Sequence, residues 1–175
     1  MVFGMSLATF TLIHVIISLI GIGSGLIVLF GMFGGKRLDG MTALFLVTTV
    51  LTSLTGYLFP FEHLLPSHVV GGISLVVLAI AIVARYSFHL AGRWRTIYLI
   101  TAVMALYLNC FVLVVQSFLK VPALHALAPK GNEPPFAIAQ GILLVLFIVA
   151  GILAVKKFRQ VDATTLSRAA AAVKS

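Results

Sequence analysis

The sequence predicts an all-α, polytopic integral membrane protein that forms a bundle of five transmembrane helices. The chain is 61% hydrophobic and only 9% charged, and its mean hydropathy is +1.18. A soluble domain is about half apolar and about a quarter charged. Several apolar runs reach the length that crosses a bilayer as a helix, and they are too long for the alternating strands of a membrane barrel. Because backbone groups in lipid must bond to one another, helices are the remaining choice.

The spans follow one another through residues 1–159, which we interpret as a single transmembrane bundle domain. The amino-terminal run opens without Lys or Arg and is too long for the core of a signal peptide, so we expect it to be retained as the first helix. Turn-forming or basic residues separate each run from the next. The expected spans are Phe10–Phe33, Met41–Phe59, His68–Leu90, Thr96–Leu119 and Phe136–Val155.

The connections differ in charge, and this difference predicts the orientation. Lys36 and Arg37 follow the first span, three arginines surround the turn after the third span, and more cations follow the fifth. All six prolines lie in the other loops. The positive-inside rule then places the amino terminus outside, and it places the polar tail, residues 160–175, in the cytoplasm. The net charge of +8 is thus mainly a topology signal. It predicts no nucleic-acid binding, although it can attract anionic lipid.

Two stretches of the chain echo each other. His14-Val15-Ile16 opens one apolar segment and His68-Val69-Val70 opens another, and residues 43–50 align with residues 96–103. We interpret this as a tandem duplication of a helical hairpin, spans one and two with spans three and four, to which a fifth helix is added. Parallel repeats of this kind are related by an axis along the membrane normal. The two histidines would then lie at equivalent depth near the outer face.

Histidine nitrogen ligates haem iron and transition metals. A b-type haem held by His14 and His68 is one hypothesis. A copper or zinc site is another, and its ligands would be His14, His63, His68 and Glu62. The competing interpretation, which we favour, is that these are amphipathic interfacial residues that need no cofactor.

Uncharged polar residues inside the spans suggest a further hypothesis. Such side chains commonly bond neighbouring helices, at about 0.5–2 kcal/mol each. They can also line a small-molecule or quinone pocket that opens outward between the histidines. No Asp or Glu lies in mid-span, which disfavours an ion-coupled transporter. The candidate pocket residues are Asn109, Gln116 and Gln140 in the spans, together with Glu133 on the outer side before the fifth span.

The sequence offers little for catalysis. Cys110 is the only cysteine, so an intramolecular disulfide is excluded, and CxxC and phosphate-loop motifs are absent. No nucleophile motif accompanies the serines and histidines. Gly21 and Gly25 form a GxxxG pair, which predicts close helix packing within the bundle or a homodimer face. We therefore lean against an enzyme, and we expect the bilayer as one partner and a homodimer or larger membrane complex as others.

Five segments resemble a group of small bacterial inner-membrane proteins for which no activity is assigned. The resemblance spans roughly residues 14–158, and it implies a bacterial inner membrane without implying a cofactor or a catalytic residue. The segments are His14–Gly21, Thr55–Phe61, Leu65–Gly71, Ala105–Asn109 and Glu133–Gln140.

We expect a non-catalytic accessory or ligand-binding membrane protein with its functional surface on the outer face. Two alternatives stay open. One is a redox protein that binds haem or metal through His14 and His68, and the other is a small-molecule carrier or channel.

Overall fold

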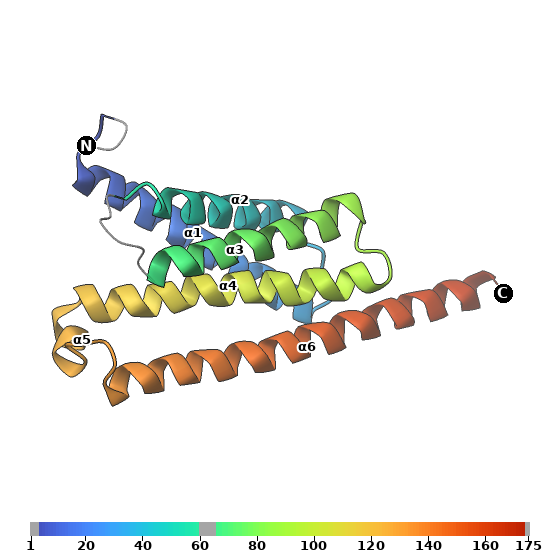
Figure 1. Ribbon diagram of the computed structural model, residues 1–175. Coiled ribbons are helices and arrows are strands. Elements are labelled where there is room, and N and C mark those ends of the chain that lie inside the picture. Colours follow the sequence, from blue (N-terminus) through green and yellow to red (C-terminus); the bar gives the residue numbers. More distant parts are fainter. Residues whose placement is uncertain (1–3, 60–65, 174–175) are drawn as a thin grey trace.

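The computed structural model describes residues 4–59 and 66–173, with side chains for residues 4–59 and 68–158. These residues form helices and no strands. The helices run back and forth along one common direction (Figure 1). In chain order the elements are α1 (Leu7–Phe33), α2 (Asp39–Gly56), α3 (Pro66–Ile82), the π-helical turn η1 (Val83–Ser87), α4 (Arg93–Lys120), α5 (Pro122–Leu127) and α6 (Pro134–Val173).

The first four long helices form a ring in chain order. α1 packs on α2, α2 on α3, α3 on α4, and α4 closes the ring against α1. α6 lies outside the ring against α1 and α4, and it extends beyond the other helices toward the carboxyl terminus (Figure 1). The described connections between helices therefore lie at the two ends of the bundle. One end holds the start of α1, the end of α2 and the start of α3, and we call it the histidine end. The other holds the α1–α2 connection and η1, and we call it the basic end.

Four helices of the described chain are long and apolar enough to cross a membrane. They are Leu7–Phe33, His68–Ser87, Arg93–Lys120 and Pro134–Phe158. The remaining predicted span, Met41–Phe59, forms α2. This helix is not among the four because five threonines, a serine and an aspartate dilute its apolar residues. α2 is nevertheless a full member of the ring, since it lies between α1 and α3. The count of five spans and the hairpin duplication both stay predictions.

The helix boundaries differ from the sequence prediction most at the end of α3. The predicted span His68–Leu90 is interrupted by η1, and the chain then turns through His89 and Leu90, whose φ angles are 49° and 60°. Positive φ is uncommon for residues other than glycine. The rings of Phe88 and Trp94 stack across this turn with centroids 3.8 Å apart, which holds α4 against η1.

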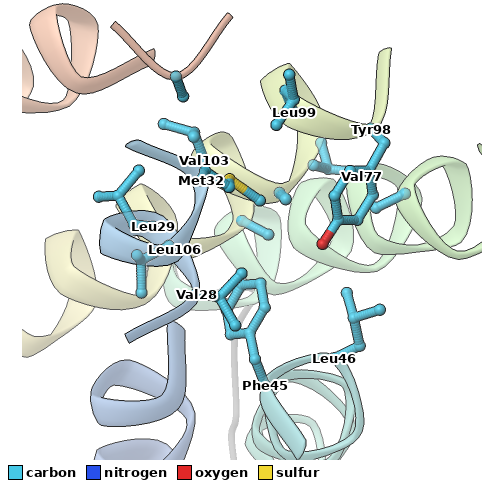
Figure 2. Packing of buried hydrophobic residues seen from close by; sticks show 14 of the residues in the cluster. Val28, Leu29, Met32, Phe45, Leu46, Val77, Tyr98, Leu99, Val103 and Leu106 are labelled. Carbon is cyan, nitrogen blue, oxygen red and sulfur yellow. The ribbon is translucent and has the colours of Figure 1, made fainter. Parts of the chain in front are cut away.

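The hydrophobic core lies inside the four-helix ring. Its largest fully buried apolar side chains are Phe45, Leu78, Leu99 and Leu106. Val28 of α1 and Phe45 of α2, both labelled in Figure 2, line the same small gap in this core. The absence of a side chain at Gly25 permits close packing here, because a Cβ there would lie 2.6 Å from Leu106 Cδ1 and 2.8 Å from Phe45 Cδ2. The predicted GxxxG pair is thus used within the chain, where it lets α1 approach α2 and α4.

α6 is peripheral to this core. Only 6% of its most apolar 18-residue stretch is buried, compared with 44% of the corresponding stretch of α4. Among the described side chains of α6, those of Ala154 and Phe158 are buried. Its exposed face consists of Ile, Leu and Val side chains, which is the composition expected of a surface that faces lipid. The predicted tail, residues 160–175, continues the backbone of α6 as a helix to Val173.

Candidate functional site

His14 lies half-buried at the histidine end, where it bonds to α2. Its Nδ1 is 2.7 Å from Thr55 Oγ1, and Thr55 Oγ1 is also 2.7 Å from the carbonyl oxygen of Leu51. A carbonyl only accepts, so the single hydroxyl hydrogen of Thr55 goes to Leu51. Both contacts are satisfied at once if His14 Nδ1–H donates to Thr55. In the neutral ring, Nε2 is then unprotonated. Its lone pair can accept a hydrogen bond or ligate a metal.

An aromatic wall flanks the His14 imidazole. Phe59 packs edge-on against His14 with ring centroids 5.2 Å apart, and Phe10 packs against Phe59 at 5.0 Å. The wall and the Thr55 bond together fix the ring orientation. This half-buried position combines an apolar surface with one polar nitrogen, as expected of a site for an amphipathic ligand.

His68 lies in the first turn of α3 and is only 6% exposed. Its carbonyl oxygen accepts a hydrogen bond of 2.5 Å from the Tyr57 hydroxyl, and the two rings lie with centroids 5.5 Å apart. Gly71 and Gly72 make room for this tyrosine, because a Cβ at Gly72 would lie 3.0 Å from the Tyr57 hydroxyl. The end of α2 therefore contacts His14 through Thr55 and His68 through Tyr57.

The predicted pocket residue Asn109 lies in the middle of the bundle. Its Nδ2 donates to Thr49 Oγ1 at 3.3 Å, and Gly21 closes the cluster from α1, since a Cβ there would lie 3.4 Å from Asn109 Nδ2. Nearby, Ser53 and Ser74 join α2 to α3 through hydroxyl oxygens 3.2 Å apart. α2 is thus the polar helix of the bundle and bonds to each helix that surrounds it.

The hydrogen bonds of the predicted pocket residues Gln140 and Glu133 go to partners other than His14. Gln140 Nε2 donates to the Phe111 carbonyl at 3.2 Å, which ties α6 to α4. Gln116 is half-buried on α4. The Glu133 carboxylate accepts backbone N–H groups of Lys130 at 2.9 Å and Asn132 at 3.1 Å. The hydrogen bond from Lys130, followed by others from the same loop, lowers the pKa of Glu133. That carboxylate therefore serves its own loop.

The predicted metal site is only partly within the described chain. Glu62 and His63 lie outside the described residues. Among the described residues, no group of three or more His, Cys, Asp or Glu side chains could hold a metal ion. The predicted haem ligands His14 and His68 both contact the end of α2, His14 through Thr55 and His68 through Tyr57.

Sequence reasoning missed the main polar contact at the basic end. It counted Arg85 as one of the three arginines around the turn after the third span. The structure instead buries Arg85, whose side chain is 8% exposed, and pairs it with Asp39 at the start of α2. The available signal was the opposite charge of two residues at the adjoining ends of neighbouring helices. Comparisons of the chain with protein-family models, curated proteins and solved structures found no match.

Proposed function

We propose that this chain is a non-catalytic, ligand-binding membrane protein whose site is the histidine end. The observation that carries the proposal is the His14–Thr55 bond, which orients the ring and leaves Nε2 as an acceptor beside an apolar wall. Such a site suits an amphipathic small molecule that carries a hydroxyl donor, of which a quinol is the example. The aromatic wall takes the apolar body, and Nε2 takes the hydroxyl hydrogen.

The test uses the purified full-length protein in detergent with a short-chain quinol as probe. A ligand that binds only the folded state raises the unfolding temperature. We expect a concentration-dependent rise for the wild type and none for His14→Ala. His89→Ala is the matched control, since His89 is exposed at the basic end, and it should respond like the wild type. A quinol response that survives in His14→Ala, or that is missing in the wild type, would contradict the proposal.

The second candidate function is the binding of haem or a metal through the same His14 nitrogen, Nε2. A ligating histidine typically donates its other N–H to a neighbouring acceptor, as His14 Nδ1 does to Thr55. We expect this function to show as a Soret band or bound metal after haem or metal is supplied. The band should be lost in both His14→Ala and His68→Ala. A colourless, metal-free wild type after reconstitution would exclude it and leave the first function.

We further propose that the protein resides in a bacterial inner membrane with the basic end in the cytoplasm. The support is the charge of the two ends, because Lys36, Arg37 and Arg85 lie at one end and positive charge favours the cytoplasmic side. A green fluorescent protein fused to the carboxyl terminus should fluoresce, whereas alkaline phosphatase fused there should be inactive. The opposite pair of results would reverse the orientation.

A further inference from the structure

A small crevice opens at the basic end, remote from the histidine end. It has an empty volume of about 230 Å³, and the α1–α2 connection, α2, η1, α4 and α6 contribute to its wall. The crevice combines cationic, hydroxyl and apolar groups, which is the mixture that a phosphate ester with a hydrocarbon tail would meet. Its polar and aromatic lining consists of Lys36, Arg37, Thr42, Arg85, Tyr98 and Phe158.

The charge in this crevice is predominantly positive. Lys36, Arg37 and Arg85 supply three cations, and the carboxylate that neutralises part of this charge is Asp39, on Arg85. The Asp39 side chain is 79% exposed, so water screens it more than it screens the buried guanidinium. Arg85 sits on η1, and π-helical turns are frequent at functional sites. An anion at the crevice would therefore meet an excess of positive charge.

A buried hydroxyl also lines the crevice. Tyr98 is 2% exposed, and its hydroxyl makes no hydrogen bond to the described residues, although Thr42 and Arg85 lie close to it. The Arg85 guanidinium carbon lies 5.3 Å from the Tyr98 ring centroid. A buried hydroxyl without a partner is uncommon in folded proteins and points to a missing ligand or water. A phosphate oxygen beside Arg85 would accept this O–H.

An apolar crevice adjoins the cationic one. The two share Val28 and Met32, and the apolar crevice has an empty volume of about 170 Å³ between α1, α2 and α4. Gly25 and Phe45 form part of its wall, and Figure 2 shows Val28, Met32 and Phe45 in this region. The residues that line the apolar crevice are buried, so it is an internal extension of the cationic crevice. The apolar surface that adjoins the cationic crevice from outside is the exposed face of α6, the helix that contributes Phe158 to the crevice.

We propose that the basic end binds the phosphate of an anionic phospholipid, with its acyl chains along the exposed apolar face of α6. Basic pockets between transmembrane helices recognise anionic head groups in this way, and arginine suits phosphate because its donors form a fork. The phosphate chemistry alone would also fit free inorganic phosphate. The exposed apolar face of α6, which adjoins the crevice at Phe158, favours the lipid, and the test separates the two sources.

The test counts lipids bound to the full-length protein in detergent by native mass spectrometry. Phosphatidylglycerol is titrated against phosphatidylcholine, which has the same chains and no net charge. We expect preferential retention of phosphatidylglycerol by the wild type. Each cation near an anionic lipid contributes about a fivefold gain in affinity, so Lys36→Gln with Arg37→Gln should lose about 30-fold. The matched control is Lys120→Gln with Lys130→Gln at the histidine end, which should bind like the wild type. Equal binding of both lipids, or equal loss in the control, would overturn the proposal.

A second variant keeps the test valid if loss of both cations disturbs membrane insertion. Tyr98→Phe removes only the hydroxyl that lacks a partner, so we expect the lipid-free unfolding temperature to be unchanged or higher. Phosphatidylglycerol affinity should fall about tenfold, as for the loss of a hydrogen bond to a charged group. An unchanged affinity would overturn the role of Tyr98 and with it the placement of the phosphate. If inorganic phosphate raises the unfolding temperature as much as phosphatidylglycerol does, the site binds a soluble anion instead.

Discussion

Arg85 on η1 forms an ion pair with Asp39, the first residue of α2. The two partners differ in environment, because the Arg85 side chain is 8% exposed and the Asp39 side chain is 79% exposed. A guanidinium removed from water needs a compensating charge or hydrogen bond. Asp39 also lies in the first turn of α2, where a negative charge interacts favourably with the helix dipole. One carboxylate therefore stabilises both a buried cation and a helix start.

We predict that Asp39→Asn destabilises the protein by about 1–2 kcal/mol. Breaking a fully buried pair costs about 3–5 kcal/mol and an exposed pair costs about 0–1 kcal/mol, and the exposure of Asp39 puts this pair between them. Thermal unfolding in detergent measures the change. The double variant Asp39→Asn with Arg85→Met should lose less stability than the two single variants lose together, because removal of both partners leaves no unpaired charge. Strict additivity of the two changes would show that the pair is not coupled.

Gly25 and Gly23 offer a matched comparison on α1. A Cβ at Gly25 would lie within 3 Å of Leu106 and Phe45, whereas a Cβ at Gly23 would meet nothing within 4 Å. Overpacking a core lowers the stability by about 1–3 kcal/mol. Replacing glycine by alanine inside a helix raises the stability by about 0.5–1 kcal/mol. We therefore predict that Gly25→Ala lowers the stability by about 1 kcal/mol. Gly23→Ala should leave the stability unchanged or raise it. Equal unfolding temperatures for the two variants would contradict this account of the close packing.

The sequence predicted the long helices because apolar runs of span length report directly on the bilayer. Its predicted spans agree with α1, α2, α4 and the described membrane part of α6 to within a few residues. It missed η1 and α5, because a π-helical turn and a six-residue helix are set by local backbone packing and leave no periodic pattern. It also predicted Gly25 correctly as a packing residue, since small residues at i and i+4 permit close approach.

The candidate site was less accessible from sequence. The position of His14 near one end of a span was readable, but its bond to Thr55 depends on how two helices are rotated about their axes. The rotation is set by tertiary contacts such as Gly21 against Asn109. The Arg85–Asp39 pair joins residues 46 apart in the chain, and apolar patterning carries no information on which charges meet. Pairwise polar contacts therefore required the structure.

Glu133 predicts a pH dependence of the loop before α6. Its carboxylate accepts backbone N–H groups, chiefly that of Lys130, and these bonds hold the pKa of Glu133 below its ordinary value. Because the folded-state pKa is the lower one, these bonds add stability above the unfolded pKa of about 4.3. That contribution is lost as the pH falls through the folded-state pKa. We predict that Glu133→Gln lowers the unfolding temperature at neutral pH and that the difference from the wild type shrinks below about pH 4. A difference that is constant with pH would contradict this role.

The His14 tautomer is the most direct check of the proposed ligand site. The bonding of Thr55 to both Leu51 and His14 requires the proton on Nδ1. Solid-state NMR of histidine labelled with ¹⁵N, at a pH where the ring is neutral, should report a protonated Nδ1 and an unprotonated Nε2 for His14. Assignment comes from the signal that disappears in His14→Ala. Thr55→Val removes the acceptor with little change of shape, so the neutral ring should shift toward the Nε2–H form and lose affinity for a donor ligand. Thr52→Val, one turn earlier on α2, is the control and should leave the His14 signals in place. A wild-type ring protonated on Nε2 would remove the basis of the site.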